Sequence, residues 1–185
     1  MALKRGFKAE ANRLSRQFRE ELDVDPSGKL CPWALAEFLG IPVLQLSSLA
    51  SSIPDEVGYL MHDGRECFSA VTVSVGWRRT ILHNDANHPN RQASDIAHEL
   101  AHAILLHPPS PPFSEVGKRV FDKDLEEEAN WLGFALLVSE EAALHIAKSG
   151  WSDHQAAAKY SVSEDVVKMR LSVTAARKRI KLKAR

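Results

Sequence analysis

The spacing of apolar and polar residues predicts helices at both ends of the chain and a small sheet between them. Apolar residues recur at helical spacing over residues 4–22, which predicts an amphipathic helix. A second, short helix is expected over residues 31–40, because Pro32 suits a first helical turn and Gly40 suits a helix end. Residues 41–46 (IPVLQL) follow this helix and predict a strand.

Two runs rich in β-branched and aromatic residues predict a hairpin in the middle of the chain. They are residues 67–75 (CFSAVTVSV) and 77–83 (WRRTILH), with the turn-forming Gly76 between them. The polar stretch that follows, HNDANHPNRQ, contains Pro89 and is typical of a loop. We therefore expect a small antiparallel sheet.

Two stronger helices and a helical tail are predicted beyond the sheet. The run 93–106 is helical and stops at HPPSPPF (107–113), which has four prolines among seven residues. Another helix is expected over residues 122–138, with two or three short helices after it. Because helices, strands and helices follow one another in blocks, the pattern predicts an α+β fold. We divide it into a domain of residues 1–139 and a helical C-terminal subdomain of residues 140–185.

The composition is that of a globular protein. Of the 185 residues, 44% are hydrophobic and 26% are charged, and 24 Lys plus Arg balance 24 Asp plus Glu. The overall charge therefore favours neither nucleic acid nor membrane as a partner. The N-terminal stretch lacks the apolar core of a signal peptide, and no apolar run approaches the ~20 residues of a spanning helix. Cys31 and Cys67 form no CxxC pair and are expected to be reduced thiols, which predicts a cytoplasmic protein.

Candidate chemistry is concentrated in residues 93–107, ASDIAHELAHAILLH. Residues four apart on an α-helix share one face and lie about 6 Å apart along the axis, so His98 and His102 can bind one tetrahedral zinc ion. Glu99 lies beside the pair, where its carboxylate can reach a water at the metal without being a ligand. The apolar residues around the motif favour this interpretation over two unrelated histidines.

A catalytic zinc site needs a third protein ligand and an open position for water. The extended motif HExxHxxGxxH is excluded, because Leu105 and Pro108 stand at its last two defined positions. On a continuous helix His107 would point away from His98, so we interpret it as a helix-end residue. The alternative is that a break of the helix at Pro108 turns His107 towards the site.

The later helix offers three glutamates as the third ligand. Its apolar stripe consists of Leu125, Ala129, Leu132 and Leu136. Glu127 lies nearly opposite the stripe and is expected to be solvated, whereas Glu126 and Glu128 flank it on its two edges. An acidic run also suits a solvated helix N-terminus, and this interpretation fits Glu126 and Glu127 better. Helical geometry thus favours Glu128 over Glu126.

The sequence resembles the ImmA/IrrE family of zinc metallopeptidases. The resemblance rests on HELAH (98–102) and, about 25 residues later, on EEANWLGFALLVS (127–139), and it extends to the N-terminal helices. The family helix commonly closes with Leu-Leu-Met-Pro, where this chain has Leu-Leu-Val-Ser. Bulky Trp131 stands where polar residues are common, which we expect to alter the neighbouring substrate cleft.

The resemblance implies a zincin-like domain with three Zn²⁺ ligands, His98, His102 and Glu128. It implies that Glu99 is the catalytic residue of a peptide-bond hydrolase. Asn130 stands at the family's Asn position, and we expect it to orient a ligand or the helix.

The implied reaction needs groups beyond the metal ligands. Glu99 takes a proton from the attacking water and passes it to the leaving amine. A further donor should stabilise the oxyanion, and the candidates are Tyr59, His83, His88, Arg91 and Tyr160. An extended substrate is expected to add along the edge of the hairpin. In this family the substrate is often a helix-turn-helix repressor encoded alongside the protease on a phage or mobile element, so such a repressor is the expected partner.

The C-terminal segment leaves two other functions open. Residues 155–176 have a helix-turn-helix-like pattern, and six of the nine residues from Arg177 onward are basic, as in a nucleic-acid-binding appendage. The neutral overall charge favours a packing subdomain instead. The remaining alternative is a zinc-binding regulator that acts without proteolysis.

Overall fold

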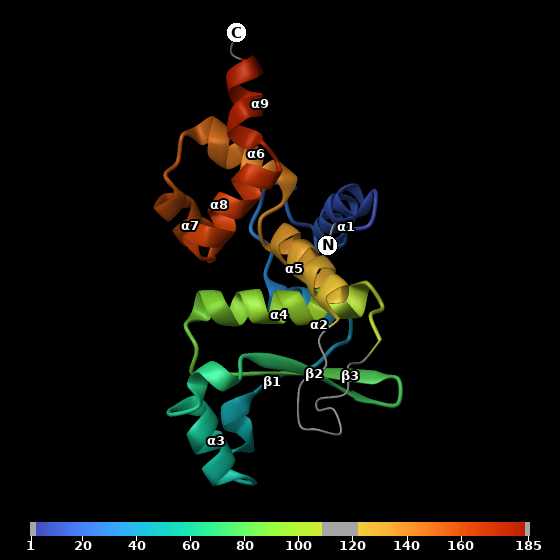
Figure 1. Ribbon diagram of the computed structural model, residues 1–185, viewed down its shortest axis with the longest axis vertical. Helices are drawn as coiled ribbons and strands as arrows, with labels where there is room; N and C mark the ends of the chain where they lie inside the picture. The colour runs from blue at the N-terminus through green and yellow to red at the C-terminus, as the bar shows by residue number, and fades with distance from the viewer. Residues whose placement is uncertain (1–2, 109–121, 184–185) are drawn as a thin grey trace.

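The computed structural model describes residues 3–108 and 122–183, in which helices, a small sheet and further helices follow one another (Figure 1). The helices are α1 (Phe7–Glu21), α2 (Pro32–Phe38), α3 (Pro54–Met61), α4 (Pro89–Ile104), α5 (Lys123–Leu137), α6 (Glu140–Ser149), α7 (Asp153–Tyr160), α8 (Glu164–Val173) and α9 (Ala176–Lys183). The strands are β1 (Val43–Gln45), β2 (Ala70–Val75) and β3 (Arg78–His83). The predicted α+β class is confirmed.

The sheet is mixed rather than antiparallel. Its order is β1-β3-β2, and the predicted hairpin of β2 and β3 is present, with Val71 opposite Leu82. The central strand β3 also pairs with β1, in parallel, with Leu44 opposite Leu82. The antiparallel expectation is wrong for β1, because α3 and β2 intervene in the chain and bring β3 back in the direction of β1. This order places β2 at an edge.

Two helices begin at prolines, at positions where the sequence pattern predicts no helix start. Pro54 begins α3, and Asp55 and Glu56 fill its first turn, where acidic side chains complement the helix dipole. Helix α4 begins at Pro89 rather than at residue 93, and the side chain of His88 accepts a hydrogen bond from the Asn90 amide. The tail also differs, with four helices from α6 to α9.

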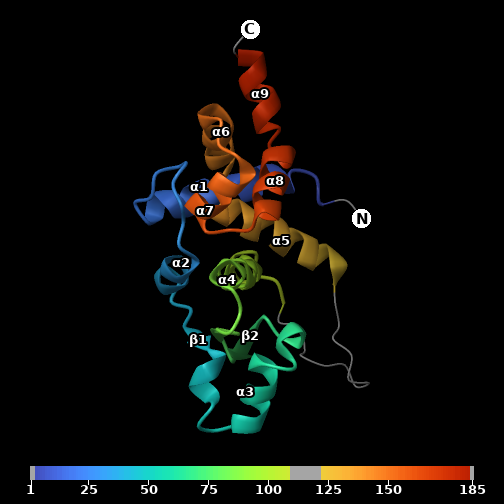
Figure 2. The same ribbon diagram turned by 90° about the vertical axis from the view of Figure 1, so that its left-hand side faces the viewer.

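Helix α4 forms the middle layer of the molecule. Figure 2 shows α4 end-on, with the sheet and α3 on one side and α1, α5 and the C-terminal helices on the other. One apolar cluster joins α1, α2, α4, α5 and the sheet through buried residues that include Ala11, Leu35, Ile81, Leu100 and Leu132. A second cluster joins α6, α7 and α8 to the end of α5. The division at residue 139 stays a prediction.

The C-terminal end of α5 is held by two buried arginines from other helices. Arg19 on α1 donates from Nη2 to the Leu136 carbonyl at 2.8 Å, and Arg170 on α8 donates from Nε to the Val138 carbonyl at 2.7 Å. Terminal carbonyls have no partner within a helix, and cations complement its C-terminal dipole. Burial lowers the pKa of both guanidinium groups to about 10, so both stay charged at neutral pH. These contacts hold the end of α5 against α1 and α8.

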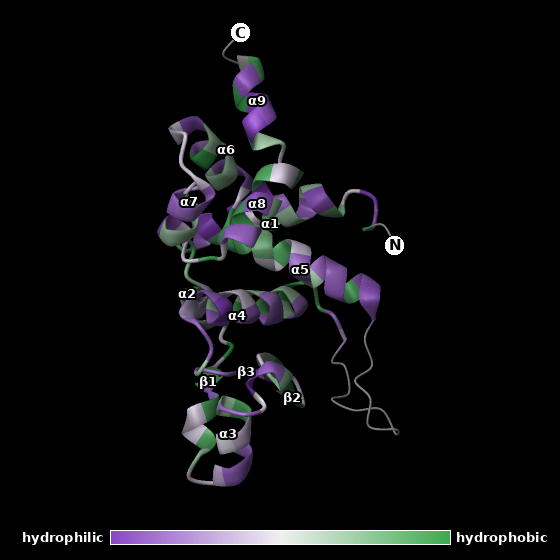
Figure 3. Cartoon of the chain, turned by 60° about the vertical axis from the view of Figure 1, so that its left-hand side comes forward, coloured by the Kyte–Doolittle hydropathy of each residue, from purple (hydrophilic) through white to green (hydrophobic). Residues whose placement is uncertain are grey.

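Helix α9 is mainly hydrophilic along its length (Figure 3). Figure 3 shows mostly hydrophilic residues along α9, whereas apolar residues are concentrated where α5 meets its neighbours. None of the helices within residues 3–108 and 122–183 has both the length and the apolar content needed to cross a membrane.

Candidate metal centre

His98 and His102 lie one turn apart on α4, and their rings converge. Their Nε2 atoms are 3.1 Å apart, and the ring centroids are 4.7 Å apart in an edge-on arrangement. Two ligand atoms on a tetrahedral zinc ion with bonds of about 2.0–2.1 Å are roughly 3.3 Å apart. The spacing of the two imidazoles therefore fits one shared ion.

Glu126 on α5 completes the group. Its Oε2 lies 3.2 Å from Nε2 of His98, and its Oε1 lies 3.6 Å from Nε2 of His102. Hydrogen bonding to His102 and to His98 holds the pKa of Glu126 far below its ordinary value, against the opposing effect of burial. The carboxylate is therefore ionised, as a metal ligand must be. Each of the three side chains remains 21–29% exposed, so the group has an open side.

The structure places Glu128, the favoured candidate from the sequence, away from this group. Its side chain is 6% exposed, and its carboxylate lies 3.3 Å from Nε2 of His107 and 3.1 Å from Nζ of Lys4. The sequence pattern predicts one buried stripe on this helix, but α5 is covered on two sides. Ala129 and its stripe face the core, and a second face, which carries Glu126, packs on α4.

A glycine marks that second face. Gly133 lies seven residues after Glu126, about two turns along α5, and approaches α4 closely. A Cβ added at Gly133 would lie 3.2 Å from the carbonyl oxygen of Ala97 and 3.2 Å from the backbone nitrogen of His98. A glycine inside a helix costs stability unless close packing requires it, so Gly133 is the sequence signal that could have identified the face of Glu126.

Asn130 and Glu99 each have one defined partner. Asn130 Oδ1 lies 3.1 Å from Nδ1 of His98. A proton on Nδ1 would leave Nε2 of His98 free to bind metal. Thr72 on β2, which the sequence did not single out, donates its hydroxyl to Oε2 of Glu99 at 2.6 Å. The catalytic candidate is thus held at the edge of the sheet.

His107 also belongs to the site, and the expectation that it points away is wrong. Helix α4 ends at Ile104, and Leu106 adopts a left-handed conformation with φ of 55°. The chain therefore turns before Pro108, and Nδ1 of His107 lies 2.9 Å from Nδ1 of His102. Residues 109–113 of the proline-rich run lie outside the described part of the chain.

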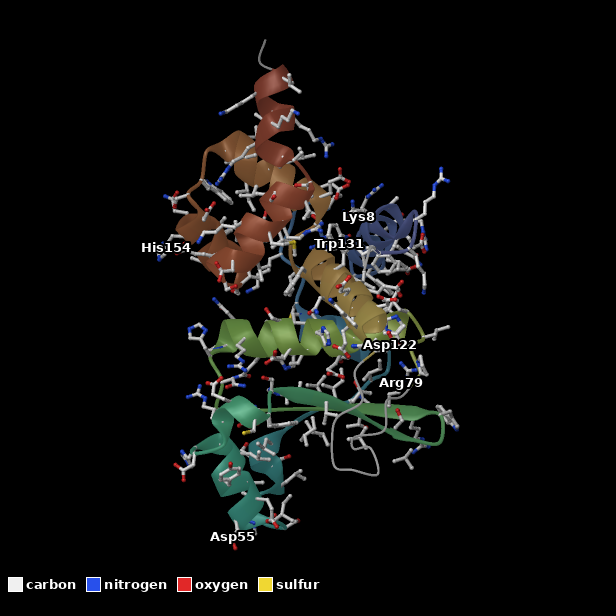
Figure 4. All side chains as sticks on the ribbon, in the orientation of Figure 1. Lys8, Asp55, Arg79, Asp122, Trp131 and His154 are labelled. Atoms are coloured by element: carbon white, nitrogen blue, oxygen red, sulfur yellow. The ribbon has the colours of Figure 1, made fainter. Side chains whose placement is uncertain are left out.

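A pocket lies beside the group on the side of α5. It is lined by Ser94, Asp95, His98, Glu126, Asn130, Gly133 and Phe134. Burial raises the pKa of Asp95 to about 6, and the nearby Arg91 only partly opposes this. Trp131 is not among the lining residues. Figure 4 shows it beside Lys8 of α1, whose Nζ lies 4.5 Å from the centre of the indole ring.

None of the five candidates for oxyanion stabilisation lines this pocket. The hydroxyl of Tyr160 donates to the Ser27 carbonyl, and the ring of His83 is buried against Trp33. Tyr59 lies on the separate helix α3. The remaining two, His88 and Arg91, line a neighbouring cavity. The structure therefore brings none of the five candidates into the pocket beside the metal-binding residues.

An HExxH pair on a packed helix, closed by a carboxylate from a second helix, defines a metallopeptidase centre. The family model described as IrrE N-terminal-like domain (Peptidase_M78) matches residues 36–172. The chain therefore belongs to this metallopeptidase family, and the resemblance to ImmA/IrrE proteins is confirmed. No curated protein and no solved structure matches the chain.

Proposed function

We propose that this protein is a zinc-dependent endopeptidase that cleaves a helix-turn-helix transcriptional repressor in the cytoplasm. The observation that carries the peptidase proposal is the convergence of His98, His102 and Glu126 beside Glu99. Two imidazoles and one carboxylate with near-tetrahedral spacing suit Zn²⁺, and they leave a coordination position open, as catalytic zinc sites do.

We assign the third ligand position to Glu126 instead of Glu128. Of these two glutamates, Glu126 has its carboxylate beside the Nε2 atoms of both histidines, whereas Glu128 contacts His107 and Lys4. When bound, the zinc ion lowers the pKa of a coordinated water towards ~7 and polarises the scissile carbonyl.

Glu99 is the proton carrier in this proposal. Its carboxylate takes a proton from the attacking water and delivers that proton to the leaving amine as the C–N bond breaks. The hydroxyl of Thr72 holds one carboxylate oxygen, Oε2, which leaves the other oxygen available to the water. Asn130 orients His98 from the far side of its ring.

Two features beside the site support an extended peptide as the substrate. The strand β2 lies at the edge of the sheet and carries Thr72, so a peptide that adds to this edge passes beside Glu99. A mainly apolar cavity of about 740 Å³ between α4 and α8 shares Ser94 and Phe134 with the pocket at the metal-binding residues. We assign this cavity to an apolar side chain of the substrate.

The repressor and the compartment are the finer parts of the proposal. Membership of the ImmA/IrrE family supports a repressor as substrate, because cleavage of such a partner is what the resemblance implies. Both Cys31 and Cys67 are free, which suits a reducing compartment.

The test is cleavage of the helix-turn-helix repressor encoded beside this gene, with the two proteins purified and mixed with Zn²⁺. The wild type should cut the repressor, and Glu99→Gln should abolish cleavage while zinc content stays near one ion per chain. Glu127→Gln is a matched control, because Glu127 is a half-exposed glutamate paired with Lys123 outside the pocket. Cleavage by Glu99→Gln at the wild-type rate would exclude Glu99 as the proton carrier. A wild type that binds zinc but leaves the repressor intact would exclude the peptidase proposal and favour a zinc-binding regulator.

A further inference from the structure

The end of α4 has a backbone geometry that places one histidine over another. The His107 amide donates to the His102 carbonyl at 3.0 Å, and the Leu106 amide donates to the Ala103 carbonyl at 3.2 Å. Together with the left-handed Leu106, these two bonds form a Schellman motif. In that motif the residue two positions after the cap contacts the third residue from the helix end, which here places His107 against His102, with ring centroids 4.9 Å apart.

A line of hydrogen bonds continues from His102 into the protein. Nδ1 of His102 lies 2.9 Å from Nδ1 of His107, and Nε2 of His107 lies 3.3 Å from Oε2 of Glu128. The other carboxylate oxygen of Glu128 lies 3.1 Å from Nζ of Lys4. Both His107 and Glu128 are buried, with exposures of 6% and 4%. Glu128 is thus a buried carboxylate that contacts two partners, and not a solvated surface group.

Only one proton arrangement satisfies every member of this line with neutral imidazoles. Because Glu128 can only accept when ionised, His107 must carry its proton on Nε2 and accept at Nδ1. His102 must then carry its proton on Nδ1, which leaves the Nε2 lone pair directed at His98 and Glu126. The same logic applies to His98, whose Nδ1 faces the amide oxygen of Asn130. Both imidazoles are thus held in the tautomer that binds metal through Nε2.

We propose that His107 and Glu128 are positioning residues for the metal site, acting through His102. They fix the tautomer and the ring orientation of His102, so that its Nε2 lone pair is directed at the proposed metal position. This inference rests on the proposed zinc site and assigns a role to the buried Glu128, which is not a ligand. Outer partners of metal-binding histidines typically change metal affinity by about 10–100-fold when removed.

The experiment measures the Zn²⁺ dissociation constant of the full chain by competition with a chelator of known affinity. His107→Ala should weaken zinc binding about 10–100-fold, with a stoichiometry that stays at one at saturating zinc. His107→Gln should recover part of the affinity, because its amide can accept from one neighbour and donate to the other. Glu128→Gln should lie between His107→Ala and the wild type, because it keeps the acceptor and loses the charge.

A matched control and a second readout separate positioning from a general effect on folding. His154→Ala removes a histidine on α7, far from the site (Figure 4), and should bind zinc as the wild type does. Thermal unfolding of the zinc-free variants reports stability, and a merely structural role would change this without the graded loss of affinity. If His107→Ala binds zinc with wild-type affinity, the inference is overturned. If the alanine variant does not fold, the same outcome for His107→Gln overturns it. If the wild type itself binds no zinc, the proposed function fails as well.

Discussion

The close contact of α5 with α4 at Gly133 is expected to control both stability and the metal site. Replacing Gly133 with alanine puts a methyl group 3.2 Å from Ala97 O and from His98 N, both of them backbone atoms. The helices must move apart by a few tenths of an ångström, and overpacking of this kind costs about 1–3 kcal/mol. Alanine recovers about 1 kcal/mol of helix propensity, so the net loss of stability is about 0–2 kcal/mol.

The same movement should be detectable at the metal. Gly133 lies about two turns from Glu126 on the same face of α5, so displacement of the helix carries the Glu126 carboxylate away from His98. We therefore expect Gly133→Ala to weaken zinc binding several-fold and Gly133→Val to weaken it further.

The assay is urea unfolding of the zinc-free protein together with chelator competition for zinc. Gly58→Ala is the matched control, because Gly58 lies inside α3 and an added Cβ would meet nothing within 4 Å. It should raise the free energy of unfolding by about 0.5–1 kcal/mol and leave zinc affinity unchanged. The prediction is refuted if Gly133→Ala stabilises the protein as much as Gly58→Ala does and binds zinc with wild-type affinity. That result would exclude the close packing of α5 on α4 at Gly133 and its effect on the position of Glu126.

Four further expectations follow from contacts at the site and in the tail. Glu126→Ala should lose zinc on dialysis, whereas Glu128→Ala should keep one ion per chain at saturating zinc; metal analysis showing the reverse would return the ligand position to Glu128. Thr72→Val should lower the rate of repressor cleavage about tenfold at full zinc content, because the variant loses the hydrogen bond to Glu99. Thr72→Ser keeps a hydroxyl and should retain activity. Equal cleavage rates for the wild type and both variants would show that this hydrogen bond does not contribute to catalysis. In the zinc-free protein the pKa of Asp95 is raised to about 6, so folding favours the protonated form of this side chain. The free energy of unfolding of the wild type, relative to that of Asp95→Asn, should therefore fall by about 1–2 kcal/mol between pH 4 and pH 7 in urea titrations. A difference between the two proteins that does not change with pH would contradict this. Duplex DNA should not bind at low salt in a gel shift, because Arg177 and Arg179 are paired with Asp153 and Glu140; a salt-sensitive shift would support the DNA-binding alternative.

The sequence was sufficient for the parts of the site that lie within one helix. The spacing of His98 and His102 determines a shared face on any α-helix, and the structure brings their Nε2 atoms together as expected. The hairpin, the active-site helix and the later helix were likewise predictable from local patterns, and the family match agrees with the resemblance seen in the sequence.

Features that depend on packing between elements were not predictable in the same way. The choice between Glu126 and Glu128 depends on how α5 crosses α4, and the apolar stripe alone does not report the face marked by Gly133. The role of His107 depends on how α4 ends. Just beyond the end of the helix, Leu106 adopts the left-handed backbone conformation, and this conformation is uncommon for leucine. The parallel pairing of β1 depends on the path of the chain through α3, which no local pattern encodes.

The most direct test of the central claim is a crystal structure of the zinc-loaded protein, with an anomalous difference map calculated at the zinc absorption edge. We predict a single peak about 2.0–2.2 Å from Nε2 of His98, Nε2 of His102 and a carboxylate oxygen of Glu126. Glu128 should remain hydrogen-bonded to His107 in the same crystal. A peak bonded to Glu128, or no peak at the two histidines, would contradict the account.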